Sequence, residues 1–363
     1  MIDFTLFDSM TFRDELVEKF EEGSGEVLAE GDERNTIINT MLYIAEVLMN
    51  EINAQANNNL VAFCDMAHLI YFGMQQDTYR LEATKATCTV RFTISDQADS
   101  NVTIPAGTRV TADGEVFFAT DAATTIAPES YADIPCTATE AGAQGNGYSA
   151  GQINILANTI AYVDSVSNTT ASAVGSDIQS EEDFREDVLY APLKYNTTGS
   201  EGAYIQKTKE VSASIADVAV TASGSNVSVY ILCKNGALPS TALKDLVLEY
   251  LTKPGVKPVT DSVSVLSAVQ QTYTIDMSYK IAVADRTRIT EIQAAVNEAV
   301  DEYIKEIGYV MGKPINPEML RKVAYTAGAA SVTVNYPAYT NLASYQTAVC
   351  TSKTVTYDGL LGA

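Results

Sequence analysis

The sequence predicts a multidomain α+β protein with an N-terminal helical bundle segment, a β-rich middle domain and two C-terminal α+β modules. Three observations support this fold class. Apolar residues recur at helical spacing before about residue 80, short alternating stretches rich in Gly, Ala, Thr, Ser and Asn fill residues 85–175, and both patterns occur beyond residue 176. We place the domains at residues 1–82, 83–176, 177–269 and 270–363, and 363 residues supply material for several cores.

The N-terminal segment is predicted to contain three helices. The first carries Phe12, Leu16 and Phe20 and ends in a glycine-containing break, and the third is expected from Leu60 to Met74. The second begins near Asp32, and its apolar residues follow the spacing of a coiled-coil seam: Ile38, Met41, Ala45, Leu48 and Ile52, with Ile37 and Ile44 on one side. This seam fits the internal core of a small helical domain or one member of an intermolecular bundle, and the pattern alone does not decide between them.

The sequence of the middle domain has the pattern expected of short strands joined by glycine-rich turns. Residues 89–94 alternate between polar and apolar, as a half-buried strand does. Val110 and Val116 flank Asp113-Gly114, which predicts a tight hairpin. No long helical stripe occurs between residues 85 and 175, so the domain is expected to be all-β.

The last two domains mix helices with strands. In the third, helices are expected at residues 180–190, 200–211 and 240–253, with strands at 215–221, 227–232 and 263–266. The fourth opens with a strand whose alternate residues from Tyr273 to Val283 are apolar, and a long amphipathic helix then runs from Ile289 until Gly308 terminates it. Asn316-Pro317 is expected to cap a helix to about Ala327, before a strand at Val332–Tyr336.

Composition excludes several classes of function. The chain has 23 Lys and Arg against 46 Asp and Glu, a formal net charge of −23, which repels nucleic-acid phosphates and anionic lipids. We therefore expect no nucleic-acid partner. No run of about 18 apolar residues occurs, so no membrane insertion is expected, and the first residues lack the basic and apolar regions of a signal peptide. The five cysteines are isolated from one another, which fits folding in a reducing cytoplasm.

No residue set is predicted to be catalytic, cofactor-binding or metal-binding. His68 is the only histidine, so a metal held by two histidines is excluded. A dyad of Cys64 and His68 on one helix face is conceivable, and a partly buried structural histidine on a packing helix is the interpretation we favour. The Gly142–Gly147 stretch lacks the Lys-Ser/Thr of a phosphate-binding loop and is interpreted as a turn. The acidic residues 181–187 are interpreted as the start of a helix, where carboxylates are favoured, rather than as a hydrolytic pair.

Four segments carry a resemblance to a known family. The first joins Pro105-Ala106-Gly107-Thr108 to Phe117-Phe118-Ala119-Thr120, and the second spans residues 138–146. The third runs from Val163 through Gly175 to Arg185, and the fourth is residues 198–204. In this order and spacing they resemble the baseplate J-like family, the wedge proteins of contractile phage tails and related injection machines. The resemblance assigns structural roles to Pro105, Gly107, Thr108, Glu140, Gly142, Gly145, Asn146, Ser180, Arg185, Gly199, Ser200 and Tyr204.

The residue types at these positions suit turns and helix starts. Pro105 fixes φ, the glycines permit tight backbone paths, and Arg185 can pair with Glu181 or with a neighbouring element. One departure from the family pattern is Val174, which stands where the family often has the first glycine of a pair.

The resemblance also implies an assembly. A wedge would contain a second copy of this chain and one different wedge chain, with the N-terminal helices brought together in a bundle. Ile38, Met41, Ala45, Leu48 and Ile52 would then be bundle contacts. The module from about residue 270 would link neighbouring wedges into a ring around the hub and spike, close to sheath-proximal baseplate proteins. Rearrangement of this ring would license sheath contraction.

We therefore expect a non-enzymatic wedge subunit that needs no cofactor. It would be made in the bacterial cytoplasm and assembled into the baseplate of a phage tail, a tail-like bacteriocin or a related particle. The alternative is a tail-tip or cell-surface adhesin that binds a glycan through the strands rich in Thr, Asn and Gly. The absence of Trp and of a signal peptide argues against the adhesin.

Overall fold

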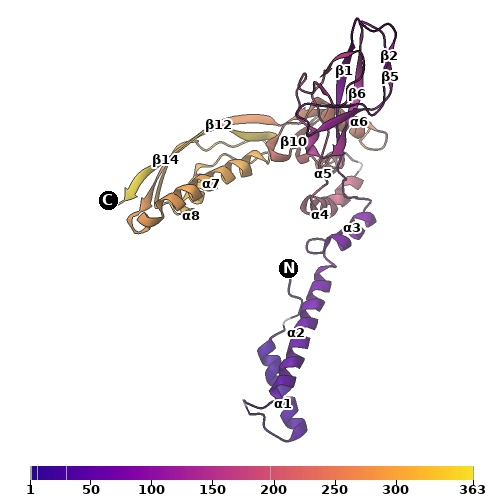
Figure 1. Ribbon diagram of the computed structural model, residues 1–363. Coiled ribbons are helices and arrows are strands. Elements are labelled where there is room, and N and C mark those ends of the chain that lie inside the picture. Colours follow the sequence, from indigo (N-terminus) through magenta and orange to yellow (C-terminus); the bar gives the residue numbers. More distant parts are fainter. Residues whose placement is uncertain (1, 6, 30, 197, 363) are drawn as a thin grey trace. The chain divides into compact units, whose positions relative to one another are not determined.

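A computed structural model describes residues 2–5, 7–29, 31–196 and 198–362. The chain divides into two units (Figure 1). The helical unit consists of residues 1–80 together with residues 180–191, and the main unit consists of residues 81–179 and 192–363. Residues 180–191, which we predicted to open the third domain, thus pack with the N-terminal helices instead.

The helical unit contains α1 (Ser9–Ser24), α2 (Asn35–Asn57), α3 (Met66–Gln75) and α4 (Glu181–Tyr190). The N-terminal end of α1 is capped by Asp8, whose side chain accepts a hydrogen bond from the Met10 N–H at 3.2 Å. The helix ends at Gly25, which has a left-handed backbone. α1 packs against α2, and its residues Phe12, Leu16 and Phe20 are half-buried, as their spacing predicts.

The residues before α1 are held against the end of α2 by two asparagines. The Asn57 side chain is buried, accepts a hydrogen bond from the Ile2 N–H at 3.0 Å and donates to the Ile2 carbonyl at 2.8 Å. The Asn53 side chain accepts from the backbone N–H groups of Phe4 and Thr5 at 2.9 and 3.0 Å. An amide side chain that both donates and accepts can pair with an extended backbone in the way that another strand does.

α3 and α4 pack around a small core of Cys64, Leu69, Phe184 and Val188. The third helix begins at Met66, and not at Leu60 as predicted, because Asp65 caps it by accepting from the His68 N–H at 2.9 Å. Residues 58–63 form turns between α2 and α3. Apolar spacing continued through these turns, so the pattern did not mark the break.

The middle domain is a six-stranded antiparallel sheet in the order β7-β3-β4-β6-β1-β8, with a separate ribbon of β2 and β5. The two edges meet, because the Asn168 N–H of β8 donates to the carbonyl of Ile153, two residues before β7, at 3.1 Å. Alternate residues of β1, from Cys88 to Ile94, are buried in the core. The strands are β1 (Lys85–Ile94), β2 (Val102–Ile104), β3 (Arg109–Thr111), β4 (Phe117–Thr120), β5 (Thr124–Ile126), β6 (Tyr131–Ala141), β7 (Ile155–Leu156) and β8 (Val163–Asn168).

The central domain covers a three-stranded sheet with two helices. The sheet order is β11-β10-β9, with β9 and β10 antiparallel and β10 and β11 parallel. Its core includes Val229 and Ile231 from the sheet and Val247 and Leu251 from the second helix. The elements are α5 (Glu201–Lys209), β9 (Ile215–Ser223), β10 (Asn226–Cys233), α6 (Thr241–Thr252) and β11 (Ser262–Ser267).

The C-terminal domain has one face of its sheet covered by helices, as Figure 1 shows for α7 and α8. The sheet order is β13-β12-β14, with β13 antiparallel and β14 parallel to the central strand. The predicted alternation of β12 is confirmed from Tyr273 to Ile281, because Tyr273, Ile275, Met277, Tyr279 and Ile281 are all buried. Val283, which we included in the run, lies beyond the end of the strand and is exposed. The elements are β12 (Val269–Ala282), α7 (Ile289–Gly308), α8 (Pro317–Thr326), β13 (Ser331–Tyr336) and β14 (Gln346–Leu361). The sequence analysis did not predict β14.

Candidate assembly surfaces

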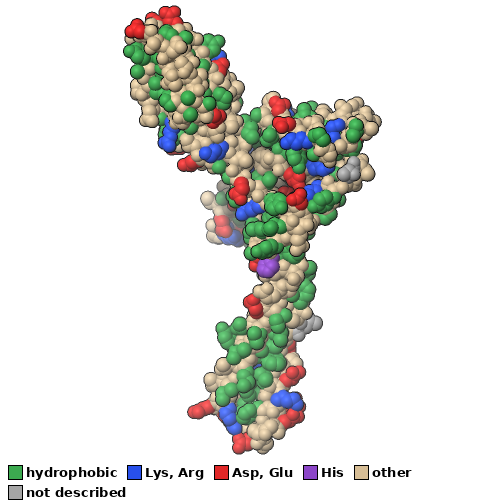
Figure 2. All heavy atoms as spheres, turned by 90° about the vertical axis from the view of Figure 1, so that its right-hand side faces the viewer, with side chains coloured by type: hydrophobic (Ala, Val, Ile, Leu, Met, Phe, Trp, Pro, Cys, Tyr) green, Lys and Arg blue, Asp and Glu red, His purple; other side chains and the backbone are tan. Residues whose placement is uncertain are grey.

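The predicted seam on α2 divides between two faces of the helix. Ile38 is buried and Ala45 half-buried on the side that packs against α1, whereas Met41, Leu48 and Ile52 are 52%, 55% and 48% exposed. Ile37 and Ile44 are exposed as well. We call the exposed set Ile37, Met41, Ile44, Leu48 and Ile52 the α2 stripe. In Figure 2, apolar side chains gather over the lower part of the view, where the α1–α2 hairpin lies.

The helical repeat explains why one helix has two apolar faces. At about 100° per residue, the members of the α2 stripe fall within one narrow sector. Ile38, Leu42, Ala45 and Met49, all buried or half-buried, fall in a neighbouring sector. The inner sector forms the contact with α1. Within the described residues no segment of the helical unit covers the α2 stripe, which makes it an unfilled packing surface.

Charge is distributed unevenly over the chain. Twenty Asp and Glu against five Lys and Arg give residues 1–80 and 180–191 a formal net charge of −15 out of the total of −23. By contrast, residues 270–363 hold nine acidic and eight basic side chains, a net charge of −1. The helical unit therefore repels copies of itself through solvent much more strongly than the C-terminal domain does.

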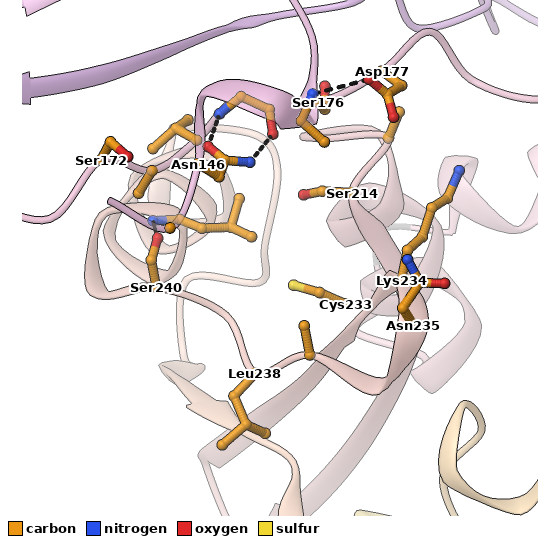
Figure 3. Close-up of a pocket in the computed structure, with 18 residues that line it drawn as sticks. Asn146, Ser172, Ser176, Asp177, Ser214, Cys233, Lys234, Asn235, Leu238 and Ser240 are labelled. Carbon is orange, nitrogen blue, oxygen red and sulfur yellow. Dashed lines mark hydrogen bonds between the residues drawn. The ribbon is translucent and has the colours of Figure 1, made fainter. Parts of the chain in front are cut away.

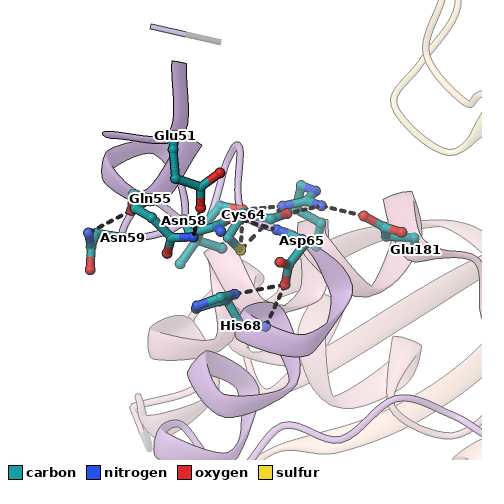
Figure 4. A network of polar contacts seen from close by, with 10 residues as sticks. Glu51, Gln55, Asn58, Asn59, Cys64, Asp65, His68 and Glu181 are labelled. Carbon is teal, nitrogen blue, oxygen red and sulfur yellow. Dashed lines mark hydrogen bonds and ion pairs between the residues drawn. The ribbon is translucent and has the colours of Figure 1, made fainter. Parts of the chain in front are cut away.

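Arg185 of α4 joins that helix to the turn between α2 and α3. Figure 4 shows this network of polar contacts, with Cys64 of the turn and Glu181 of α4 labelled. The Arg185 guanidinium donates to the carbonyls of Val61 at 2.5 Å and Cys64 at 2.8 Å, and to Glu181 Oε1 at 2.6 Å. The Arg185 side chain is 18% exposed, so these bonds are largely shielded from water. Both pairings expected for Arg185, with Glu181 and with a neighbouring element, are present. Ser180 caps α4 by accepting from the Asp183 N–H at 3.1 Å.

His68 is not placed for catalysis with Cys64. Its side chain is 46% exposed, not partly buried as we expected, and its Nδ1 lies 2.8 Å from Asp65 Oδ1. The buried Cys64 Sγ lies 3.6 Å from the Val61 carbonyl and 3.5 Å from Arg185 Nη1. Hydrogen bonds from the His68 backbone and ring hold the pKa of Asp65 below its usual value. The surroundings of both residues are those of a helix cap and a packed thiol.

The first family motif forms one hydrogen-bonded turn in the middle domain. The Pro105 carbonyl accepts from the hydroxyls of Thr108 at 2.8 Å and Thr120 at 2.7 Å. Gly107, with a φ of 80°, donates its N–H to the Thr120 carbonyl at 2.8 Å. The Thr120 N–H also donates to the Thr108 carbonyl at 3.0 Å, and the Thr108 N–H donates to the Thr120 hydroxyl at 3.0 Å. The two halves of this motif, which stand apart in sequence, thus hold each other in place. The predicted hairpin at Gly114 follows, with a loop between Thr111 and Phe117.

The second and third motifs also bind each other. The Asn146 side chain donates to the Gly175 carbonyl at 2.6 Å and accepts from the Gly175 N–H at 2.9 Å. A Cβ at Gly175 would lie 2.5 Å from the Gly142 carbonyl oxygen, and one at Gly145 would lie 2.7 Å from the Ala86 Cβ. Glu140 is exposed and accepts from Gln144 Nε2 at 3.2 Å. These glycines are needed for close approach of backbone segments, and not for binding phosphate.

The fourth motif fixes the start of α5 in the central domain. Ser200 caps the helix by accepting from the Ala203 N–H at 3.4 Å. The buried Tyr204 donates its hydroxyl to Asp261 at 2.7 Å, and burial together with this carboxylate raises the pKa of Tyr204. Gly199 has a φ of 79°, and a Cβ there would lie 2.9 Å from the Asp261 carboxylate. The motif therefore joins α5 to the loop that precedes β11.

A cavity of about 460 Å³ lies between the middle and central domains of the main unit (Figure 3). Its walls include Asn146, Ser176 and Asp177 from the middle domain and Cys233 and Lys234 from the central domain. Burial raises the pKa of Cys233 to about 11, so at neutral pH the group is a thiol and a poor nucleophile. No histidine lines the cavity. Among the described residues no cluster of His, Cys, Asp and Glu is placed to hold a metal ion.

Family models match three stretches of the chain. The baseplate J-like protein barrel domain matches residues 89–175, the baseplate J-like central domain matches residues 196–267, and the baseplate J-like protein C-terminal domain matches residues 273–357. Together they cover more than half of the chain in the expected order. The chain belongs to the baseplate J-like protein family. It is therefore a structural baseplate component and not an enzyme, and the predicted multidomain α+β fold class is confirmed.

Comparison with solved structures and with curated proteins adds two findings. A chain of the anti-feeding prophage (AFP) baseplate, solved by cryo-EM with sixfold symmetrisation, is similar over 94% of this baseplate J-like chain and 90% of its own length. The sequence identity is 10% and the TM-score is 0.44. No curated protein sequence matches this chain. Within the residues that the structure describes, no helix is long and apolar enough to cross a membrane.

Two surfaces of this baseplate J-like protein were missed or only partly found from the sequence. The α2 stripe was found in part, because the predicted seam mixed its residues with those that contact α1. The open edge of β14 was missed because apolar and polar residues alternate in this strand only from Thr354 to Tyr357. The run of β-branched and aromatic residues from Thr354 to Tyr357 was the signal available for it.

Proposed function

We propose that this chain is a wedge subunit of the baseplate of a contractile tail or tail-like particle. Its α2 stripe would pack in a bundle with a second copy and a different wedge chain, and its C-terminal domain would join neighbouring wedges into a ring around the hub and spike. Rearrangement of that ring would license contraction of the sheath. The observation that carries the proposal is the α2 stripe, since five of the seven large apolar side chains exposed on α2 lie in one sector of the helix.

The physical argument is that such a stripe is unfavourable in water and favourable in a bundle. Burying apolar surface contributes roughly 25 cal/mol per Å², so covering five large side chains stabilises a complex by several kcal/mol. The 3-4 spacing suits helix-on-helix packing. Membership of the baseplate J-like family favours this function over the adhesin alternative, because baseplates are built from subunits in fixed contact.

The test is co-expression of the chain with the products of neighbouring open reading frames, followed by size-exclusion chromatography with light scattering. We expect a discrete complex of two copies with one different chain. Leu48→Asp with Ile52→Asp should abolish it, because two carboxylates would be desolvated in the bundle. The matched control is Asn50→Asp with Ala54→Asp, which adds two carboxylates at the same spacing on another exposed face of α2.

The control variant should still form the complex. If the wild-type chain remains a monomer with every neighbouring product, or if the stripe variant assembles as well as the wild type, the wedge assignment is wrong. Circular dichroism of both variants should show unchanged helix content, because all four positions lie outside the contact with α1 and are exposed.

A further inference from the structure

β14 leaves one edge of the C-terminal sheet open. It is 16 residues long and pairs on one side with β12, while its other side has no neighbouring strand among the described residues. Apart from its bonds to β12, the strand's backbone hydrogen bonds to other segments are limited to its first residue, Gln346. A long open edge presents unpaired N–H and C=O groups, which is a template for another strand.

The regular part of this edge is short and well defined. The pairing of β12 with β14 shifts register between Tyr273 and Thr274 and again between Tyr279 and Ile281. Between these irregularities, residues 352–357 run in continuous register with residues 274–279. Ser352, Lys353, Thr354 and Thr356 are exposed, while Val355 and Tyr357 are half-buried against the core. This six-residue stretch has high β propensity and no proline.

The charges on the edge are already balanced within the chain. Lys353 Nζ lies 2.7 Å from Asp301 of α7, and Lys280 of β12 lies 3.7 Å from Asp358. The C-terminal domain as a whole carries a net charge of −1, whereas the helical unit carries −15. Two copies of this edge can therefore approach with little repulsion, and no excess charge selects a basic or acidic partner. A second copy of the chain is the occupant that this neutrality favours.

We propose that residues 353–357 pair antiparallel with the same residues of a second copy, through a twofold axis at Val355. A twofold axis perpendicular to a sheet places each residue opposite one of the same parity, so Thr354 would face Thr356 of the partner subunit. Lys353 would then lie opposite Tyr357 of the partner subunit. The two three-stranded sheets would become one six-stranded sheet. This refines the proposed contact between neighbouring wedges and rests on the proposed function only for its place in the assembly.

The contact is expected to be weak in isolation. About five residues a side bury less than a standard interface of roughly 1,600 Å², which places such a contact among transient ones. We expect a dissociation constant on the order of 100 μM for the free chain. In a ring, neighbouring subunits are held together by other contacts, so a weak pairing is populated at high effective concentration.

The experiment measures self-association of the full chain by sedimentation equilibrium up to about 1 mM. All samples carry Leu48→Asp and Ile52→Asp, so that association through the α2 stripe does not contribute. In the variant with Thr354→Lys and Thr356→Lys, each of the two cross-strand pairs formed by positions 354 and 356 brings two lysines together. Dimerisation should therefore weaken at least tenfold. Thr354→Lys with Thr356→Glu places opposite charges across the same axis, and dimerisation should return to within about threefold of the parent.

The two strand variants change the same exposed positions, so a difference between them reports cross-strand pairing and not folding. The proposal is overturned if the parent stays monomeric throughout, if the double-lysine variant dimerises like the parent, or if the lysine–glutamate variant fails to recover. Failure here leaves the bundle test unaffected, because that test changes α2 alone.

Discussion

The helical unit and the middle domain are stabilised in different ways. The middle domain has fifteen buried apolar residues in one cluster, and its motif glycines let backbone segments approach closely. In the helical unit, α1 has no buried residue and α2 has only Ile38 and Asn57. Besides a small apolar core and the packing of α1 on α2, its parts are joined by side-chain hydrogen bonds from Asn53, Asn57 and Arg185. The middle domain is complete within one chain, and the helical unit leaves an apolar face uncovered.

This difference between the two regions shows which structural features the family motifs mark in the sequence. The three family matches, residues 89–175, 196–267 and 273–357, all lie within the main unit. Several turns there require a particular glycine, proline or asparagine. An assembly stripe requires only apolar side chains at 3-4 spacing, which many sequences satisfy. The residues that identify the family are therefore those that shape its domains, while the surface proposed to bind partners carries no motif of its own.

The largest expected effect tests whether the middle domain depends on close approach of its backbone segments. The test places a side chain at Gly175, where two such segments meet. Gly175→Ala puts a Cβ 2.5 Å from the Gly142 carbonyl oxygen and 3.0 Å from the Ala86 N. Because both neighbours are backbone atoms that cannot rotate away, we expect the free energy of unfolding to fall by about 3 kcal/mol. Urea denaturation followed by circular dichroism measures it.

The matched control is Gly147→Ala, in the same segment as the second motif. A Cβ there meets nothing within 4 Å, and only the left-handed φ of 88° is strained. We expect a loss of about 1 kcal/mol. Equal losses for the two variants would show that close backbone approach does not stabilise this domain.

The next largest effect tests the helical unit, where polar contacts supplement a small apolar core. Arg185→Ala removes the donors to the Val61 and Cys64 carbonyls, which lie beside the buried Cys64. We expect a destabilisation of about 2 kcal/mol, confined to the helical unit. Hydrogen exchange of residues 60–69 should accelerate while exchange in β1 stays unchanged. Arg185→Lys should recover little, because an ammonium lacks the planar fork that reaches both carbonyls.

The middle domain offers a comparison in Arg91, whose guanidinium pairs with the Asp133 carboxylate at 2.8 Å on the surface. Arg91→Ala should leave the melting temperature unchanged within error, because both groups are exposed and screened by solvent. If Arg185→Ala also left the melting temperature unchanged, the helical unit would be stabilised by its small apolar core alone.

Much of the fold could be predicted because local rules dominate where elements start and end. Ser180, Ser200, Ser240 and Asn316 each cap a helix that we expected to begin at that position. The alternation of β12 correctly identified its buried face. The third helix was predicted too early because apolar spacing continued through the turns of residues 58–63, and the capping strength of Asp65 was overlooked.

Tertiary packing decides the rest, and a single sequence does not contain it explicitly. A seven-residue pattern on α2 does not say which apolar residues a neighbouring helix covers, so Ile38 and Met41 were grouped although only Ile38 is buried. Likewise, β14 was missed because only residues 354–357 of this 16-residue strand alternate clearly between polar and apolar side chains. The pairing of Asn146 with Gly175 joins residues 29 positions apart, and composition gives no signal for it.

The smallest predicted effect concerns a strained position next to the middle domain's closest contact. Val174 has a φ of 75°, in the left-handed region that β-branched residues rarely adopt. Val174→Gly removes this strain but adds freedom to the unfolded chain, so the two terms partly cancel and we expect a net stabilisation of about 0.5 kcal/mol.

The control Val102→Gly, at a half-buried residue in β2 with no such strain, should destabilise by about 1 kcal/mol. Thermal unfolding of both variants beside the wild type measures the difference. A destabilised Val174→Gly would mean that packing of the valine side chain outweighs its backbone strain, and the middle domain's turns would then depend on side chains as the helical unit does.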